Sequence, residues 1–123
     1  MEDEATLDEI EYVVKHCSSK KAPGLDGLSY EFYQATWLLI KETFVKVIQC
    51  QLNRVRIVES NTLGATRLCS KVEGVPKVDD LRPITLLNCD YKILSKLLVL
   101  RIKPVLPKVI KSCLLYTSDA ADE

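Results

Sequence analysis

An unbroken helical repeat of side chains runs from about Ser29 to about Asn53, and it limits what this chain can fold into more than any other feature. Its members recur at steps of three and four residues, the period of one helix face. The stripe consists of Tyr33, Trp37, Ile40, Phe44, Val47 and Gln51, and Leu39, Ile48 and Leu52 widen it. We therefore predict one long amphipathic helix, whose aromatic residues belong to a core rather than to a base-stacking surface.

Shorter helices are predicted on both sides of it. Thr6 and Glu9 have the spacing of a capping box, in which each side chain bonds the other residue's exposed backbone amide. Asn88 is a typical N-cap for a later helix, Pro104 ends or kinks that helix, and Pro107 fits the first turn of a last short one. The two predicted apolar faces are Leu7, Ile10, Val14 and Cys17, and then Ile93, Leu94, Leu97, Leu98 and Ile102.

Between the long helix and Asn88 the pattern is that of a β-hairpin. Residues 66–70 alternate weakly, residues 71–80 read as a loop, and residues 81–87 form a second strand-like run. Pro83 has no amide hydrogen to donate, so its strand must be irregular there or lie at an edge. The predicted fold class is α+β, mainly helical, with one β-hairpin.

The chain has 123 residues, which is enough for one domain or a piece of one. It contains five cysteines. No apolar run reaches the roughly 18 residues of a membrane span. The acidic N-terminus does not resemble a signal peptide, so we expect an intracellular protein, in the cytoplasm or nucleus, without a membrane partner. The irregular cysteine spacing, with His16 beside Cys17, predicts no metal site and mostly buried, reduced thiols.

The net charge of zero hides an uneven distribution. All 17 basic residues lie between Lys15 and Lys111, together with eight acids, so this segment carries nine excess positive charges. Such a segment suits a phosphate-rich partner, although a solvated charged surface would have the same composition.

Four basic residues are candidates for contact with such a partner. Arg82 and Lys71 lie at opposite ends of the predicted hairpin loop, and paired strands would let them face one anion together. Two unrelated surface charges are the alternative. Lys20 and Lys21 precede a tight turn rich in glycine, which lacks the GxxxxGK[ST] pattern of a Walker loop.

Two segments carry a family resemblance. KKAPGLDGLSYEFYQATW (Lys20 to Trp37) and LRPITLLNCDYKILSKLLVLRIKPVLPKVI (Leu81 to Ile110) resemble the N-terminal part of the reverse transcriptases of non-LTR, LINE-type retrotransposons. That family has a K-[AS]-P-G-x-D-G segment followed by an R-P-I-[ST]-L-L-N-x-x-Y-K segment. Both are present here in the same order.

The resemblance implies that this region is the fingers of a right-hand polymerase, where a hairpin closes over the incoming deoxynucleotide. Arg82 matches the family arginine that contacts the triphosphate, and Lys71 matches the basic residue on the preceding strand. Lys20 and Lys21 are then candidates for nucleic-acid contact. For the complete parent enzyme the resemblance implies Mg²⁺, an RNA template and a DNA primer.

The chain departs from the family pattern in one respect that concerns catalysis. It contains no [FY]-x-D-D motif, whose aspartates hold two magnesium ions in the family's palm. Asp79 and Asp80 lie in the hairpin loop and do not replace it. We therefore expect no catalytic residues, no bound cofactor and no DNA synthesis by this chain alone.

The predicted organisation has three parts. Residues 1–19 are an acidic helical region, residues 20–112 a partial reverse transcriptase domain, and residues 113–123 a tail of adapter-like sequence that is not native. Two alternatives to the polymerase-fragment hypothesis stay open. One is a small retroelement-derived module that binds a protein, and the other is a truncated gene model without a function of its own.

Overall fold

The computed structural model describes residues 4–54 and 56–110, so the interpretation of residues 113–123 as a non-native tail lies outside the described residues. The helices are α1 (Leu7–Lys15), α2 (Tyr30–Arg54), α3 (Cys89–Ile102) and α4 (Leu106–Val109), and the strands are β1 (Gly64–Ser70) and β2 (Leu81–Leu87). Short 3-10 helices, η1 (Glu59–Thr62) and η2 (Val78–Asp80), precede the strands. The predicted α+β class is confirmed.

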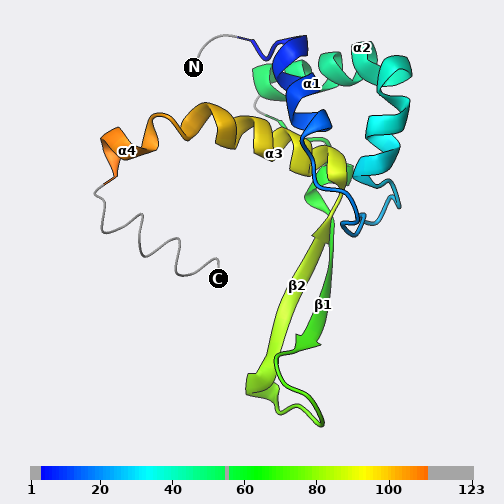
Figure 1. The fold of residues 1–123 in the computed structure, drawn as a ribbon, viewed down its shortest axis with the longest axis vertical. Helices are drawn as coiled ribbons and strands as arrows, with labels where there is room; N and C mark the ends of the chain where they lie inside the picture. The colour runs from blue at the N-terminus through cyan, green and yellow to red at the C-terminus, as the bar shows by residue number, and fades with distance from the viewer. Residues whose placement is uncertain (1–3, 55, 111–123) are drawn as a thin grey trace.

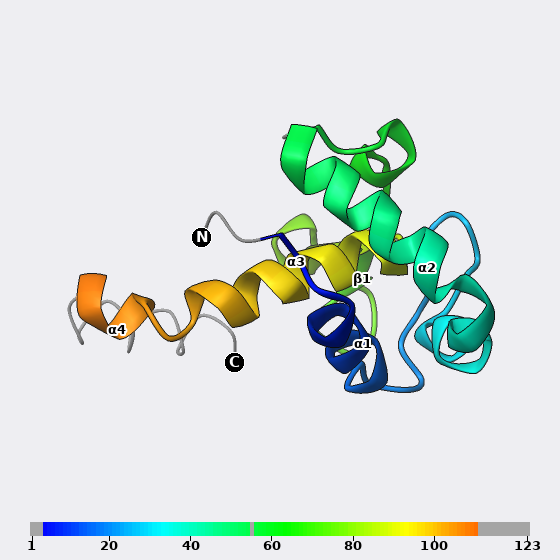
Figure 2. The same ribbon diagram turned by 90° about the horizontal axis from the view of Figure 1, so that it is seen from above.

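The molecule has two parts of different character. Helices α1, α2 and α3 pack into a body, while β1 and β2 form a hairpin that projects away from it (Figure 1). Seen from above, the second half of α3 and all of α4 extend to one side of the body (Figure 2). Among the described residues, no helix combines the length and the hydropathy needed to cross a membrane.

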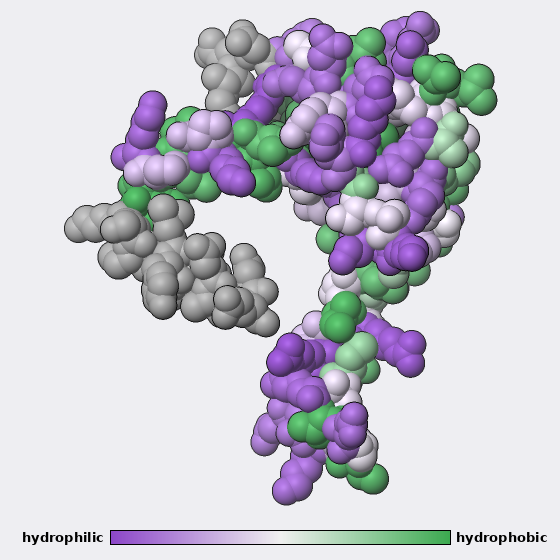
Figure 3. Space-filling view, viewed as in Figure 1, coloured by the Kyte–Doolittle hydropathy of each residue, from purple (hydrophilic) through white to green (hydrophobic). Residues whose placement is uncertain are grey.

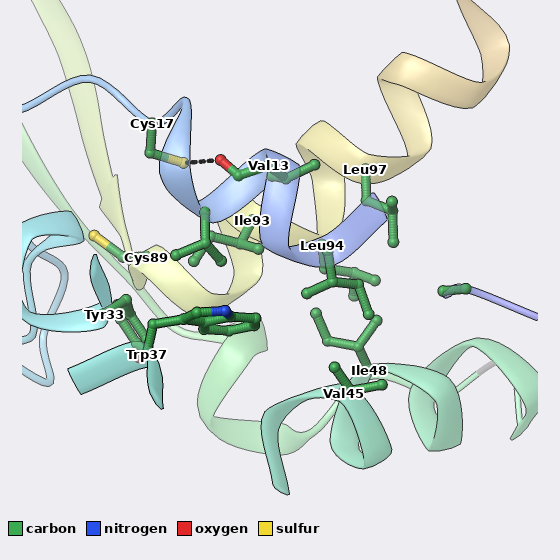
Figure 4. Packing of buried hydrophobic residues seen from close by; sticks show 13 residues of the cluster. Val13, Cys17, Tyr33, Trp37, Val45, Ile48, Cys89, Ile93, Leu94 and Leu97 are labelled. Atoms are coloured by element: carbon green, nitrogen blue, oxygen red, sulfur yellow. Dashed lines mark hydrogen bonds between the residues drawn. The ribbon is translucent and has the colours of Figure 1, made fainter. Parts of the chain in front are cut away.

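The core lies where α1 crosses α2 and α3 (Figure 4). Its most deeply buried side chains are Ile10, Val13, Val14, Ile48, Cys89, Ile93 and Leu97. The capping box is confirmed: the Glu9 amide donates to Thr6 Oγ1 (3.3 Å) and the Thr6 amide donates to Glu9 Oε2 (3.0 Å). Leu7, expected on the buried face of α1, is instead exposed.

The long predicted helix exists, but its predicted stripe is only partly buried. Tyr33, Trp37 and Ile48 are buried as expected, whereas Leu39 is 87 % exposed and Val47 is also exposed. The reason is that α2 changes direction along its length (Figure 1). Its two limbs meet the body through different faces, so a single straight stripe does not describe both.

The hairpin is confirmed, with an antiparallel register that runs from Gly64 opposite Leu87 to Ser70 opposite Leu81. The Lys71 amide donates to the Asp80 carbonyl (2.8 Å) and extends the pairing by one step into the loop. Pro83 is tolerated because the sheet has only two strands, so one side of β2 needs no donor.

Helix α3 begins and ends close to the predicted positions, but two details differ. Asn88 holds the N-cap position without capping the helix through its side chain. Its Oδ1 accepts from the Asp26 amide (3.3 Å) and its Nδ2 donates to the Ser60 carbonyl (3.2 Å), so the buried side chain instead joins the loop before α2 to η1. Leu98 and Ile102 are each 37 % exposed, because the second half of α3 extends beyond its neighbours.

The burial of the cysteines differs from the expectation that most of them are buried. All four in the described part of the chain are free, but only Cys17 and Cys89 are buried, whereas Cys50 is exposed and Cys69 is half-buried. Burial raises the pKa of both Cys17 and Cys89, which keeps their thiols protonated.

Candidate functional site

The strand register places the two predicted hairpin residues on one face. Arg82 lies opposite Cys69, and Lys71 follows Cys69 by two residues. Because side chains two residues apart share a face of a strand, Lys71 and Arg82 are diagonal neighbours, about 7–8 Å apart at the backbone. The structure therefore brings together the pair that the sequence analysis singled out.

A third basic residue belongs to the same face. Arg67 lies opposite Ile84 and precedes Cys69 by two residues, so Arg67, Cys69 and Lys71 alternate along β1 toward one side. The alternation of residues 66–70 already implies this placement, although Arg67 was not among the residues predicted from the sequence to contact an anion. We call the face formed by Arg67, Lys71 and Arg82 the hairpin basic face.

The hairpin basic face is open to solvent. All three basic side chains are exposed, and Figure 3 shows the hairpin apart from the body, with much of its visible surface hydrophilic. Lys71 Nζ donates to the Asp79 carbonyl at 3.3 Å. Within residues 4–54 and 56–110, the two salt bridges join Lys15 to Glu11 and Arg101 to Glu9, both in the helical body.

Acidic residues in the hairpin loop reduce the local charge only in part. Asp80 lies across from Lys71 at the end of the ladder, but its carboxylate accepts from the Lys77 amide (3.0 Å) and so serves to shape the loop. Two guanidinium groups and one ammonium group therefore face solvent with no ion pair among the described residues. This arrangement suits an anion with several oxygens, such as a phosphate chain.

Lys20 and Lys21 lie elsewhere, in the loop between α1 and α2. Lys20 has a φ of 58°, and its amide donates to the Glu31 carboxylate, which fixes the chain as it approaches α2. Lys21 lines a separate hollow with residues of α3. The structure does not place either lysine on the hairpin basic face.

No group of three or more His, Cys, Asp or Glu side chains in the described part of the chain is arranged to hold a metal ion.

Comparison with known proteins gives one informative match. No family model matches the chain. It is 33 % identical over 117 residues to the transposon TX1 uncharacterized 149 kDa protein of Xenopus laevis, and this alignment covers 95 % of the chain. The chain resembles part of a transposon protein. The chain spans only 9 % of that relative's length, so the match does not show the activity or the partners of a whole protein.

Proposed function

We propose that this chain is the fingers part of a non-LTR retrotransposon reverse transcriptase, and that its hairpin contacts the phosphates of nucleotide and nucleic acid. The observation that carries the proposal is the position of Lys71 and Arg82 as neighbours on one exposed face of a projecting hairpin. The match to a transposon protein over 95 % of the chain supports the origin in a mobile element.

The chemistry of this face follows from its charges. A guanidinium group grips phosphate oxygens with two parallel hydrogen bonds, and an ammonium group adds a point charge. Positive charge held in place next to a triphosphate stabilises the negative charge that develops when pyrophosphate leaves. In the proposed parent enzyme, palm aspartates would hold Mg²⁺ and supply the chemistry of nucleotide transfer, so the role proposed for the residues of this chain is binding.

Fluorescence polarisation on the full chain tests this function. We expect a labelled deoxynucleotide and a labelled 12-nucleotide RNA to bind at about 20 mM salt, where screening is weak. Arg82→Gln and Lys71→Gln should each weaken binding about five- to tenfold, the loss of one charge-assisted contact. Lys46→Gln, which removes an exposed charge from α2, should leave it unchanged. Absence of binding by the unaltered chain, or equal effects of all three variants, contradicts the proposal.

One observation favours a second candidate, a protein-binding module. Leu38 and Leu39 of α2 are 80 % and 87 % exposed. Figure 3 shows hydrophobic surface at the corner of the molecule where α2 changes direction in Figure 1. Leu39 also lines a groove of about 360 Å³ with Phe32 and Ile40. Arg82→Ala separates the two candidates, because it should weaken nucleotide binding and leave binding of a protein through α2 unaffected.

A further inference from the structure

Three lysines from two distant parts of the sequence surround one hollow beside the root of the hairpin. The hollow has a volume of about 220 Å³ and is lined by Cys17, Ser18, Lys21, Tyr30, Lys92 and Lys96. We call it the lysine notch. Its volume is roughly seven times the 30 Å³ that one water molecule occupies in the liquid, so it can admit a phosphate group together with some of its hydration.

In the described part of the chain, none of the three lysines of the notch forms a salt bridge with a carboxylate. Lys92 Nζ lies 3.5 Å from the Ala22 carbonyl and 6.0 Å from the centre of the Tyr30 ring, and Lys96 Nζ donates to the His16 carbonyl (2.9 Å). These partners are neutral: they orient the ammonium groups and leave their charge uncompensated. Lys92 and Lys96 are half-buried, which makes the local field stronger than for fully hydrated lysines.

Neutral donors complete the lining. Burial raises the pKa of Tyr30 to about 12, so its phenol keeps its proton at neutral pH and can donate to an anionic oxygen. The Ser18 hydroxyl is a second donor. No acidic side chain lines the notch. Every charged group that faces the hollow is therefore positive, and the polar groups beside them can donate.

The position of the notch indicates the kind of anion. Lys92 and Lys96 are four residues apart on α3, so their side chains emerge on one face about 5–6 Å apart. β2 ends at Leu87 and α3 begins at Cys89, so the notch lies near the root of the hairpin. Five strand residues, or roughly 17 Å, separate Arg82 from that root. A single nucleotide cannot contact both places, whereas a nucleic-acid strand can.

We propose that the lysine notch binds the backbone phosphates of a single nucleic-acid strand, as a site separate from the hairpin basic face. This rests on the proposed function in one respect only, which is that nucleic acid is the partner of both sites. The strand lies across α3 with its phosphates toward Lys92 and Lys96, and Lys21, Ser18 and Tyr30 complete the contact.

Salt-dependent RNA binding by four forms of the full chain tests the proposal. They are the unaltered chain, Lys92→Gln/Lys96→Gln, the hairpin pair Lys71→Gln/Arg82→Gln, and a control, Lys46→Gln/Lys108→Gln, that removes two exposed charges. The glutamine side chain keeps a donor for the Ala22 and His16 carbonyls, which limits any effect on folding. Circular dichroism and urea denaturation check that each variant folds.

We expect Lys92→Gln/Lys96→Gln to weaken binding of a 12-nucleotide RNA about tenfold at 50 mM salt. The slope of log K against log salt should fall by about 1.4, because each phosphate contact with a single strand contributes about 0.7. The control should change neither value, and Lys92→Arg/Lys96→Arg should restore both. If Lys92→Gln/Lys96→Gln has the same slope as the control, the proposal that the lysine notch binds a strand is overturned. The proposal for the hairpin basic face still stands in that case if Lys71→Gln/Arg82→Gln weakens binding.

A second probe separates a strand from free phosphate. In an amide NMR titration, the RNA should shift the signals of Ser18 and Lys21 at concentrations at least tenfold below those at which inorganic phosphate shifts them. Equal potency of inorganic phosphate would overturn the assignment to a nucleic-acid strand. Binding of RNA by none of the four forms would instead contradict the proposed function together with the notch.

Discussion

Gly24 and Asn88 show how a single residue positions the loop before α2. A Cβ atom added at Gly24 would overlap the backbone and the side chain of Asn88, which is buried and holds the loop through the Asp26 amide. At Gly27 a Cβ atom would meet nothing within 4 Å, but the φ of +73° there favours glycine.

We expect these two glycines to respond differently to alanine. Gly24→Ala should lower the free energy of unfolding by about 2–4 kcal/mol, because backbone must move to relieve the overlap. Gly27→Ala should cost only about 1 kcal/mol, the strain of a left-handed residue. Urea denaturation followed by circular dichroism measures both. Equal losses would show that close packing against Asn88 is not what requires Gly24.

Two carboxyl groups give the stability opposite dependences on pH. A hydrogen bond from Arg101, then one from the Thr6 amide, lowers the pKa of Glu9 below its ordinary 4.5. Its contribution is therefore present above pH 4.5 and lost as the pH falls through the lowered value. Burial raises the pKa of Asp90 above 3.8, so its contribution is largest below pH 3.8 and lost as the pH rises through the raised value.

Neutral substitutions should therefore change the acid limb of the stability curve in opposite directions. Glu9→Gln should flatten the loss of stability between pH 5 and pH 3, by about 1 kcal/mol or less because the Glu9 side chain is 40 % exposed. Asp90→Asn should make that loss steeper. Urea midpoints at half-unit pH steps provide the measurement, and a parallel shift of both curves would argue against the assigned causes.

At the scale of elements, sequence patterns predicted the helices and the hairpin, which depend on residues near one another in the chain. Apolar spacing located α2 and α3, the Thr6–Glu9 pair located the start of α1, and alternation with a ten-residue loop located the hairpin. Once the strands pair, alternation alone puts Lys71 and Arg82 on one face. The patterns missed two features that depend on tertiary packing. One is the change of direction in α2, and the other is the lysine notch, in which Lys21 precedes Lys92 by about 70 positions.

The hairpin should be much less stable than the body that carries it. A two-stranded hairpin is marginal in water by itself, and β1 and β2 project away from the core that α1, α2 and α3 share. We expect the amides of β1 and β2 to exchange with deuterium at least 100-fold faster than those of α3 near Ile93, through local opening. Hydrogen exchange followed by NMR tests this, and protection equal to that of α3 would contradict it.

At the scale of the whole molecule, α1 fastens the two longer helices together. Gln34 of α2 donates to the Val14 carbonyl (3.0 Å) and the Cys17 carbonyl (3.1 Å), both on the C-terminal side of α1. Arg101 of α3 reaches Glu9 near the other end, at 2.7 Å. Ile10, with no exposed surface, lies in the same cluster as Trp37 of α2 and Ile93 of α3. The body is therefore expected to unfold as one unit.

Substitutions of Ile10 test whether the body unfolds as one unit. Ile10→Val should lower the free energy of unfolding by about 0.5–1.5 kcal/mol, and Ile10→Ala by about 2–5 kcal/mol, because the alanine leaves a cavity in a closed core. Trp37 is the only tryptophan in the chain, so its fluorescence reports on the packing around this one residue of α2, whereas far-ultraviolet circular dichroism reports on all helices. In both variants the two signals should move to lower urea together. If circular dichroism moved while Trp37 fluorescence did not, α1 would be an attachment to a core that α2 and α3 complete without it.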